Sequence, residues 1–150
     1  MSRQSVDERL FDEISSFTRR LRSVFGVYAS ATGLTLTRAR ALFALTRRGS
    51  LSQKDLAQEL EIETPTLVRI LDGMEQQGLI ERRGAADRRV KEIHMTAEGQ
   101  VVGAEVQALA VGLRGQIVEG IAQEDLDVAL RVLLQLNRNL AVAAGKGEHS

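Results

Sequence analysis

The chain has 150 residues, of which 43% are hydrophobic, so it can bury one core of ordinary size and share further apolar surface with a partner. It contains no cysteine, which excludes disulfides, thiol chemistry and cysteine-ligated zinc. Twenty basic and twenty acidic residues cancel, yet residues 1–50 carry nine arginines against four acids, and residues 97–150 carry four basic residues against seven acids. Local patches of charge therefore matter more than the total.

Several classes of protein are excluded by missing motifs. The amino-terminal sequence MSRQSVDERL lacks the apolar segment of a signal peptide, and no apolar run approaches the roughly 18 residues of a membrane span. There is also no phosphate-binding glycine loop, no HExxH and no Gly-x-Ser-x-Gly motif. We therefore expect a cytoplasmic protein with no membrane partner, no catalytic residues, no metal site and no cofactor.

A long amphipathic helix is predicted within residues 1–32. Ser5 and Glu8 have the spacing of a capping box, and Thr32-Gly33 interrupts the pattern. Apolar residues recur between these points at steps of three and four: Leu10, Ile14, Phe17, Leu21, Val24 and Tyr28. This periodicity is typical of a helix with one apolar face.

Three shorter helices are predicted next. Thr37 is expected to cap the first of them, which ends near Gly49, and Ser52 is expected to cap the second, around Leu56 to Leu60. The pair Thr64-Pro65 is typical of a helix start, with Thr as the cap and Pro in the first turn, and this helix ends near Gln77-Gly78. Two short helices in succession favour a helix-turn-helix.

A charged hairpin follows these helices. Leu79 to Arg83 and Val90 to Met95 are predicted as strands joined by the turn GAADR. Thr96 can cap a fifth helix, and Glu124-Asp125 can open a sixth. The predicted fold class is mainly α with a small β-wing. A winged helix-turn-helix lobe at residues 33–96 is flanked by helical regions at 1–32 and 97–144, with a flexible tail at 145–150, all in a single structural unit.

The helix after Thr64 has the features of a DNA-recognition helix. On a helical wheel the apolar residues gather in one arc, and Arg69 points roughly the opposite way. An arginine fork matches the two acceptors of guanine in the major groove, while the hydroxyls of Thr64 and Thr66 and the helix-end amides suit phosphates. Taken alone, Arg69 could equally be a solvated side chain on an amphipathic helix.

The hairpin supplies the second feature. Arg82, Arg83, Arg88, Arg89 and Lys91 lie within eleven residues that contain only Glu81 and Asp87 as acids. Arginine at a hairpin tip can enter a narrow minor groove, and Asp87 could orient Arg89 there. An edge hairpin protected from aggregation by its charges is the alternative.

Four motifs follow one another between Leu34 and Gly99. They are the helix DLAQEL, the run Thr66-Leu67-Val68-Arg69, the exit from Glu75 to Ile80, and the wing pair Asp87 and Arg89. In combination they resemble the MarR family of bacterial transcription regulators. Such a resemblance implies that DNA contacts come from the starts of the two short helices and from the wing: Ser52, Gln53, Lys54, Thr64, Pro65, Thr66, Arg69, Asp87, Arg88 and Arg89.

The resemblance also implies a homodimer, built from the first, fifth and sixth helices, on a pseudo-palindromic operator of double-stranded DNA. The apolar stripes fit this expectation, because a short chain cannot easily bury apolar helices at both ends alone. Half-site centres on the order of 34 Å apart would follow from the two-fold symmetry. A monomer that folds these helices onto its own core is the alternative.

In that family a small aromatic or phenolic ligand often binds between the DNA-binding lobe and the dimer helices. Arg19 and Tyr28 are candidate ligand residues, although a solvated helix face explains the arginines as well. The resemblance therefore implies a homodimeric repressor released by a small-molecule effector. A winged-helix module that binds another protein and lacks specific DNA binding is the alternative function.

Overall fold

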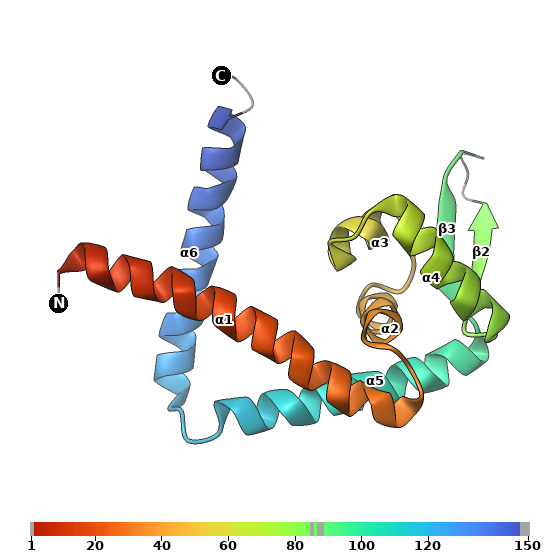
Figure 1. Cartoon of the computed structure of the whole chain (residues 1–150), viewed down its shortest axis with the longest axis horizontal. Helices are drawn as coiled ribbons and strands as arrows, with labels where there is room; N and C mark the ends of the chain where they lie inside the picture. The colour runs from red at the N-terminus through yellow and green to blue at the C-terminus, as the bar shows by residue number, and fades with distance from the viewer. Residues whose placement is uncertain (1, 85, 87–88, 148–150) are drawn as a thin grey trace. The chain divides into compact units, whose positions relative to one another are not determined.

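The computed structural model describes residues 2–84, 86 and 89–147. The helices are α1 (Arg3–Ala29), α2 (Leu36–Arg48), α3 (Gln53–Leu60), α4 (Thr64–Gln76), α5 (Ala97–Val118) and α6 (Gln123–Gly147), with a 3-10 turn at Ser30–Thr32. The strands are β1 (Leu51–Ser52), β2 (Ile80–Gly84) and β3 (Lys91–Met95). This order confirms the predicted winged helix-turn-helix with flanking helices (Figure 1). The chain divides into two compact units, residues 1–113 and 114–150, which are described separately.

The core of the first unit lies between α2, α3, α4 and the sheet. Leu42 and Leu45 of α2, Leu56 of α3, and Leu67 and Leu71 of α4 are fully buried. They occupy the inward faces of amphipathic helices, as the helical periodicity predicted. α1 packs on the start of α2, where a methyl group at Gly26 would lie 3.4 Å from the Leu36 Cβ.

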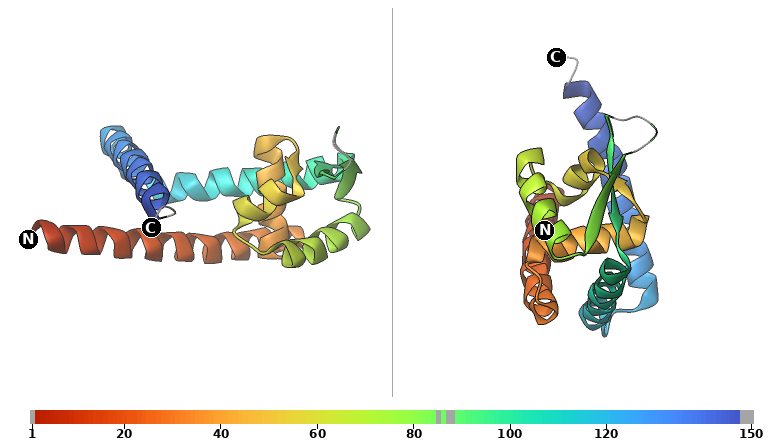
Figure 2. Two further views of the ribbon diagram at one scale, coloured as in Figure 1. Left: turned by 90° about the horizontal axis from the view of Figure 1, so that it is seen from above. Right: turned by 90° about the vertical axis from the view of Figure 1, so that its right-hand side faces the viewer.

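A three-stranded antiparallel sheet in the order β1-β3-β2 forms the wing and its base. The central strand pairs Ile93 with Leu51 on one side and with Arg82 on the other. Ile93 is fully buried, so this register places one apolar face against the helices. Figure 2 shows the β2–β3 hairpin extending beyond the helices that cover its base. The two-residue strand β1 was not predicted, because it is too short to show alternation.

The helix starts test the predicted caps. Ser52 caps α3 through a hydrogen bond from the Asp55 amide to its Oγ of 3.0 Å, and the Gly99 amide donates to Thr96 Oγ1 at 3.0 Å at the start of α5. Both predictions are confirmed.

Three other cap predictions are wrong. α1 is capped by Ser2 rather than Ser5, and α2 by Thr35 rather than Thr37, two residues earlier. α4 follows Glu63, which makes no side-chain cap, so Thr64 is its first helical residue. In each case a polar residue with extended backbone, one to three positions earlier, takes the cap position, and the spacing rule alone cannot choose between the two residues.

The second unit contains the end of α5 and α6. No residue of α6 is buried, and its apolar side chains Leu130, Leu133 and Leu140 remain 58%, 42% and 67% exposed. α6 continues to Gly147, so it includes the first residues of the predicted tail, and residues 148–150 lie outside the described part. Gln135 and Asn139 are joined by a side-chain hydrogen bond of 2.8 Å on its polar side.

Among the described residues, α5 is the one helix whose length and hydropathy would suffice to cross a membrane. Such a helix is weak evidence for a membrane span, because core helices have the same composition. Within the first unit Gly99, Gly103, Val106 and Leu113 of α5 are buried. A methyl group at Gly103 would meet Thr46 Oγ1 at 2.6 Å, so α5 packs directly on α2 there.

Candidate nucleic-acid interface

A groove of about 350 Å³ opens where three segments of the chain meet. Its lining comes from the start of α3, the start of α4 and the wing: Ser52, Gln53, Lys54, Thr64, Arg89, Val90 and Lys91. Three of these residues are basic and none is acidic. The first residues of two helices therefore line the same groove, and the dipole of a helix favours negative charge at its amino terminus. In Figure 1 the amino end of α4 and the free end of the hairpin lie on the same side of the first unit.

Five of the predicted DNA-binding residues therefore line one groove: Ser52, Gln53, Lys54, Thr64 and Arg89. Val90 and Lys91 also line it and were not among the predicted site residues. Lys91 was counted in the wing charge, and its place at the start of β3 was the available signal. Val90 carried no signal, because an apolar residue at a strand end is typical of packing.

The outward face of α4 continues from this groove. Pro65, Thr66 and Arg69 are exposed, and Leu67, Leu71 and Met74 are buried on the opposite side. Among the described residues, no hydrogen bond or ion pair holds the Arg69 guanidinium. The helical-wheel assignment of α4 is thus confirmed, and Arg69 is available to a partner outside the chain.

The charge of the wing differs from the sequence prediction. Arg83 pairs with Glu81 on its own strand. Arg82 pairs with two acids of α4, and its side chain is only 21% exposed. Both arginines were counted toward a basic wing, whereas each is paired with an acidic side chain, and Arg82 is drawn onto α4. Asp87 and Arg88 lie outside the described residues, so the predicted Asp87–Arg89 arrangement stays a prediction.

Arg82 contacts α4 through both terminal nitrogens. Its Nη2 donates to Asp72 Oδ1 at 2.6 Å and to the Val68 carbonyl oxygen at 3.2 Å, while Nη1 lies 3.3 Å from Glu75 Oε2. A second arginine, Arg38 of α2, donates to Gln77 Oε1 at 2.8 Å just beyond the end of α4. The helix is therefore held from β2 and from α2.

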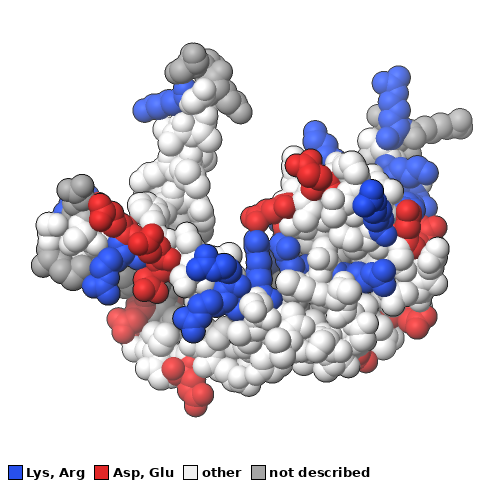
Figure 3. All heavy atoms as spheres, in the orientation of Figure 1, with Lys and Arg blue, Asp and Glu red and all other residues white. Residues whose placement is uncertain are grey.

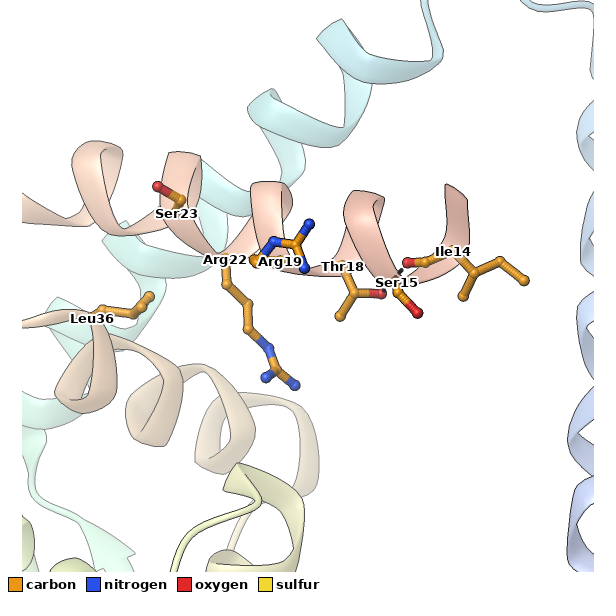
Figure 4. Close-up of a pocket in the computed structure, with 7 residues that line it drawn as sticks. All are labelled: Ile14, Ser15, Thr18, Arg19, Arg22, Ser23 and Leu36. Carbon is orange, nitrogen blue, oxygen red and sulfur yellow. Dashed lines mark hydrogen bonds between the residues drawn. The ribbon is translucent and has the colours of Figure 1, made fainter. Parts of the chain in front are cut away.

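A second hollow, of about 670 Å³, lies along α1. It is lined by Ile14, Ser15, Thr18, Arg19, Arg22, Ser23 and Leu36 (Figure 4). Arg19, a predicted ligand residue, lines it, whereas Tyr28 does not and is 37% exposed farther along the helix. Figure 3 shows basic side chains gathered along the second half of α1 and acidic ones along its first half.

Arg22 extends from this hollow toward α2 and α3 (Figure 4). Its Nη2 donates to Glu61 Oε2 at 2.7 Å. This hydrogen bond, followed by the charge of Arg22, holds the pKa of Glu61 below its usual value. Burial, followed by repulsion from Arg22, lowers the pKa of Arg40. Glu61 has a left-handed backbone, φ 55°, in the turn between α3 and α4, so this contact joins α1 to the helix-turn-helix corner. No local sequence pattern indicates a pair 39 residues apart.

Three segments that meet in a basic groove beside the outward face of α4 are the arrangement of a winged helix-turn-helix protein. The family model of the MarR family matches residues 32–90. The solved transcriptional regulator PA3341 is 35% identical over 88% of this chain and 98% of that chain, with a TM-score of 0.82. The chain belongs to the MarR family.

Two further solved structures are similar. NadR in complex with 4-hydroxyphenylacetate is 25% identical over 82% of this chain and 88% of that chain, with a TM-score of 0.72. Wild-type MarR from E. coli, in its apo form, is 17% identical over 85% of this chain and 95% of that chain, with a TM-score of 0.71, which is a likeness of fold. Regulators of this family are generally transcription factors rather than enzymes.

Proposed function

We propose that this protein is a cytoplasmic homodimeric repressor that binds a pseudo-palindromic operator. The observation that supports this most is the groove shared by α3, α4 and the wing, in which every charged lining residue is basic. Its phosphate-binding groups are Ser52, Gln53, Lys54 and Thr64. The outward face of α4, with Pro65, Thr66 and Arg69, enters the major groove, and the wing tip from Asp87 to Arg89 reaches the minor groove.

Selection of bound fragments from random duplex DNA tests the proposal and does not require the operator sequence. A specific regulator enriches an inverted repeat with half-site centres on the order of 34 Å apart. A protein-binding module without specific DNA binding enriches none. On the selected duplex, log affinity should fall steeply with log salt, as expected for about 6 to 10 phosphate contacts.

Two substitutions separate the roles of helix and wing. Arg69→Ala should cost about 1 to 3 kcal/mol on the selected duplex and relax the preference at one base of each half-site. Arg89→Ala should weaken selected and scrambled duplexes together and reduce the salt slope by about 1. Arg3→Ala, at the exposed start of α1, is the matched control. Unchanged binding in both test variants would show that this surface is not the DNA interface.

The hollow along α1 supports a small acidic effector. Arg19 lies free of the ion pair that occupies Arg22, and Ile14 and Leu36 supply apolar contacts for a ring. NadR, a structural neighbour, is solved with 4-hydroxyphenylacetate. An acid that binds the same hollow here would release the operator to the extent that it prefers one dimer shape.

Phenol and 4-hydroxyphenylacetate form a matched pair of probes, because they differ in the carboxylate arm. The acid should release the protein from a fluorescent operator duplex and so lower the anisotropy of that duplex. Phenol should not, since only the carboxylate can bind Arg19. Arg19→Ala should weaken the effect of the acid about tenfold, while Arg20→Ala, whose side chain does not line the hollow, should leave it unchanged. Equal sensitivity of both variants would exclude this hollow as the effector site.

A further inference from the structure

Arg82 is placed in the wing but bonded to the recognition helix. Arg82 lies on β2 opposite Ile93 of β3, whose side chain is fully buried. The backbone of Arg82 is therefore held in the paired sheet. Its guanidinium reaches α4, where both terminal nitrogens are engaged by Val68, Asp72 and Glu75. Its Nε is buried and makes no hydrogen bond among the described residues. Arg82 is therefore fixed both at its backbone and at its terminal nitrogens, while its Nε donor stays unsatisfied among the described residues.

The geometry of these contacts needs an arginine. One nitrogen satisfies a carboxylate and a backbone carbonyl, and the other faces a second carboxylate about one helical turn away. A guanidinium presents donors in a rigid fork, whereas a lysine offers a single point charge. The Arg82 side chain is only 21% exposed, so solvent screens the pairs less than it screens an open surface pair.

The contacts also span the part of α4 next to the proposed DNA-reading residue. Val68 precedes Arg69 directly, and Asp72 follows it by three residues, about one turn along the helix. At the other end of β2 the chain leads into the turn that carries Arg89. Through these hydrogen bonds and ion pairs, Arg82 thus connects β2, which leads to the wing tip, with the segment of α4 that carries Arg69.

We propose that Arg82 is a positioning residue, which fixes the wing against α4 so that Arg89 is already placed for the minor groove when Arg69 enters the major groove. The proposal rests on the proposed DNA-binding function. A wing that is already held in its bound position loses little conformational entropy when DNA binds. A mobile wing must be ordered on binding, and the entropic cost offsets much of the free energy that the Arg89 contact contributes. The value of Arg89 for binding therefore depends on Arg82.

A double-mutant comparison on the selected operator duplex measures this dependence. In the otherwise wild-type protein, Arg89→Ala should weaken binding about 20-fold, and in the Arg82→Met background the same change should weaken it less than about threefold. Arg69→Ala should cost the same factor in both backgrounds, because α4 itself stays in the core. Arg82→Lys should restore part of the Arg89 effect, since one cation can hold one carboxylate.

Arg83→Met is the matched control, because Arg83 is adjacent on the same strand but pairs only with Glu81 of that strand among the described residues. In this background the loss from Arg89→Ala should stay near 20-fold. If Arg82→Met fails to fold, as thermal unfolding would reveal, Asp72→Asn gives a milder test. It removes the negative charge from the shortest contact and keeps the arginine. A smaller Arg89 effect in Asp72→Asn supports the proposal.

Two results would overturn it. An unchanged Arg89 effect in folded Arg82→Met would show that the wing is positioned without this contact. Where Arg82→Met does not fold, an unchanged Arg89 effect in Asp72→Asn would show that the wing is positioned without the ion pair. Full recovery of wild-type affinity in the triple variant Arg82→Met, Asp72→Asn, Glu75→Gln would show that Arg82 only neutralises two carboxylates near the DNA. Absence of any loss from Arg69→Ala and Arg89→Ala in the wild-type background would instead refute the proposed DNA interface, and this inference with it.

Discussion

At the scale of single residues, Gly99 is the position where one methyl group should matter most. The first turn of α5 passes so close to Leu79 that a Cβ at Gly99 would overlap its carbonyl oxygen and lie 2.9 Å from its carbonyl carbon. The obstacle is backbone, held by the Thr96 amide, which donates to the same oxygen at 3.1 Å. It cannot move aside as a side chain could.

Gly99→Ala should therefore destabilise the protein by about 1 to 3 kcal/mol through overpacking. Gly112 lies on the same helix, and a methyl group there would have nothing within 4 Å, so Gly112→Ala should be neutral or stabilising by up to about 1 kcal/mol. Urea unfolding of both variants checks the contrast. Equal effects would mean that helix propensity, rather than contact with Leu79, governs both positions.

Glu61 gives a prediction in pH. The hydrogen bond from Arg22 lowers the pKa of Glu61 in the folded protein. The contact therefore stabilises the protein fully at pH values above the pKa of Glu61 in the unfolded chain, about 4.3. That contribution disappears as the pH falls through the lowered folded pKa. In Arg22→Gln the carboxyl should titrate closer to about 4.3, as seen by carbon NMR, while Arg20→Gln should leave it unchanged. An unshifted Glu61 in Arg22→Gln would refute the assigned cause.

Several residues of the candidate site could be placed from the sequence because their signals are local. Arg69 follows from helical periodicity, and Ser52 from its place before an amphipathic run. The ion pairs of Arg82 and Arg22 could not be predicted, since each depends on where two segments meet in space. Asp72 and Glu75 were visible as acids on α4, but only the packed hairpin shows that they take Arg82 out of the basic wing.

At the scale of elements, α3 depends on its cap. Ser52 Oγ accepts from the Asp55 amide at 3.0 Å, and the same residue lines the proposed phosphate groove. Ser52→Ala should cost about 1 kcal/mol of stability, and Ser52→Asn, which keeps an acceptor, should stay within a few tenths of wild type. Urea unfolding measures the stability, and anisotropy on the selected duplex measures binding. A stable Ser52→Asn variant that binds weakly would assign the hydroxyl a direct role on DNA.

The elements themselves were predicted more reliably than their ends. Long periodic segments and the hairpin were found, because their apolar residues repeat over several turns or alternate. The caps of α1, α2 and α4 were misplaced by one to three residues, since two polar residues stand close together at each helix start. The strand β1 was missed because its pairing with β3 is a tertiary contact that no local pattern reveals.

At the scale of the whole molecule, the exposed apolar residues of α6 bear on the proposed homodimer. Leu126, Leu130, Leu133 and Leu140 are separated by steps of three, four and seven, so they share one face of the helix. Leu130, Leu133 and Leu140 are among the exposed large hydrophobic residues of the chain. Exposed leucines on one helix face are typical of a surface that a partner covers.

If a second copy covers this face, a charge there should prevent the dimer from forming. Leu133→Arg combined with Leu140→Arg should turn a dimer into a monomer in sedimentation equilibrium, because a buried arginine without a partner is strongly unfavourable. Gln135→Arg, on the polar side of α6, should leave the dimer intact. Operator binding should fall with dimerisation, since one recognition helix then meets one half-site. A double-arginine variant that stays dimeric would place the dimer interface elsewhere. A wild-type protein that is monomeric and still binds an inverted repeat would show that DNA recognition does not depend on this face of α6.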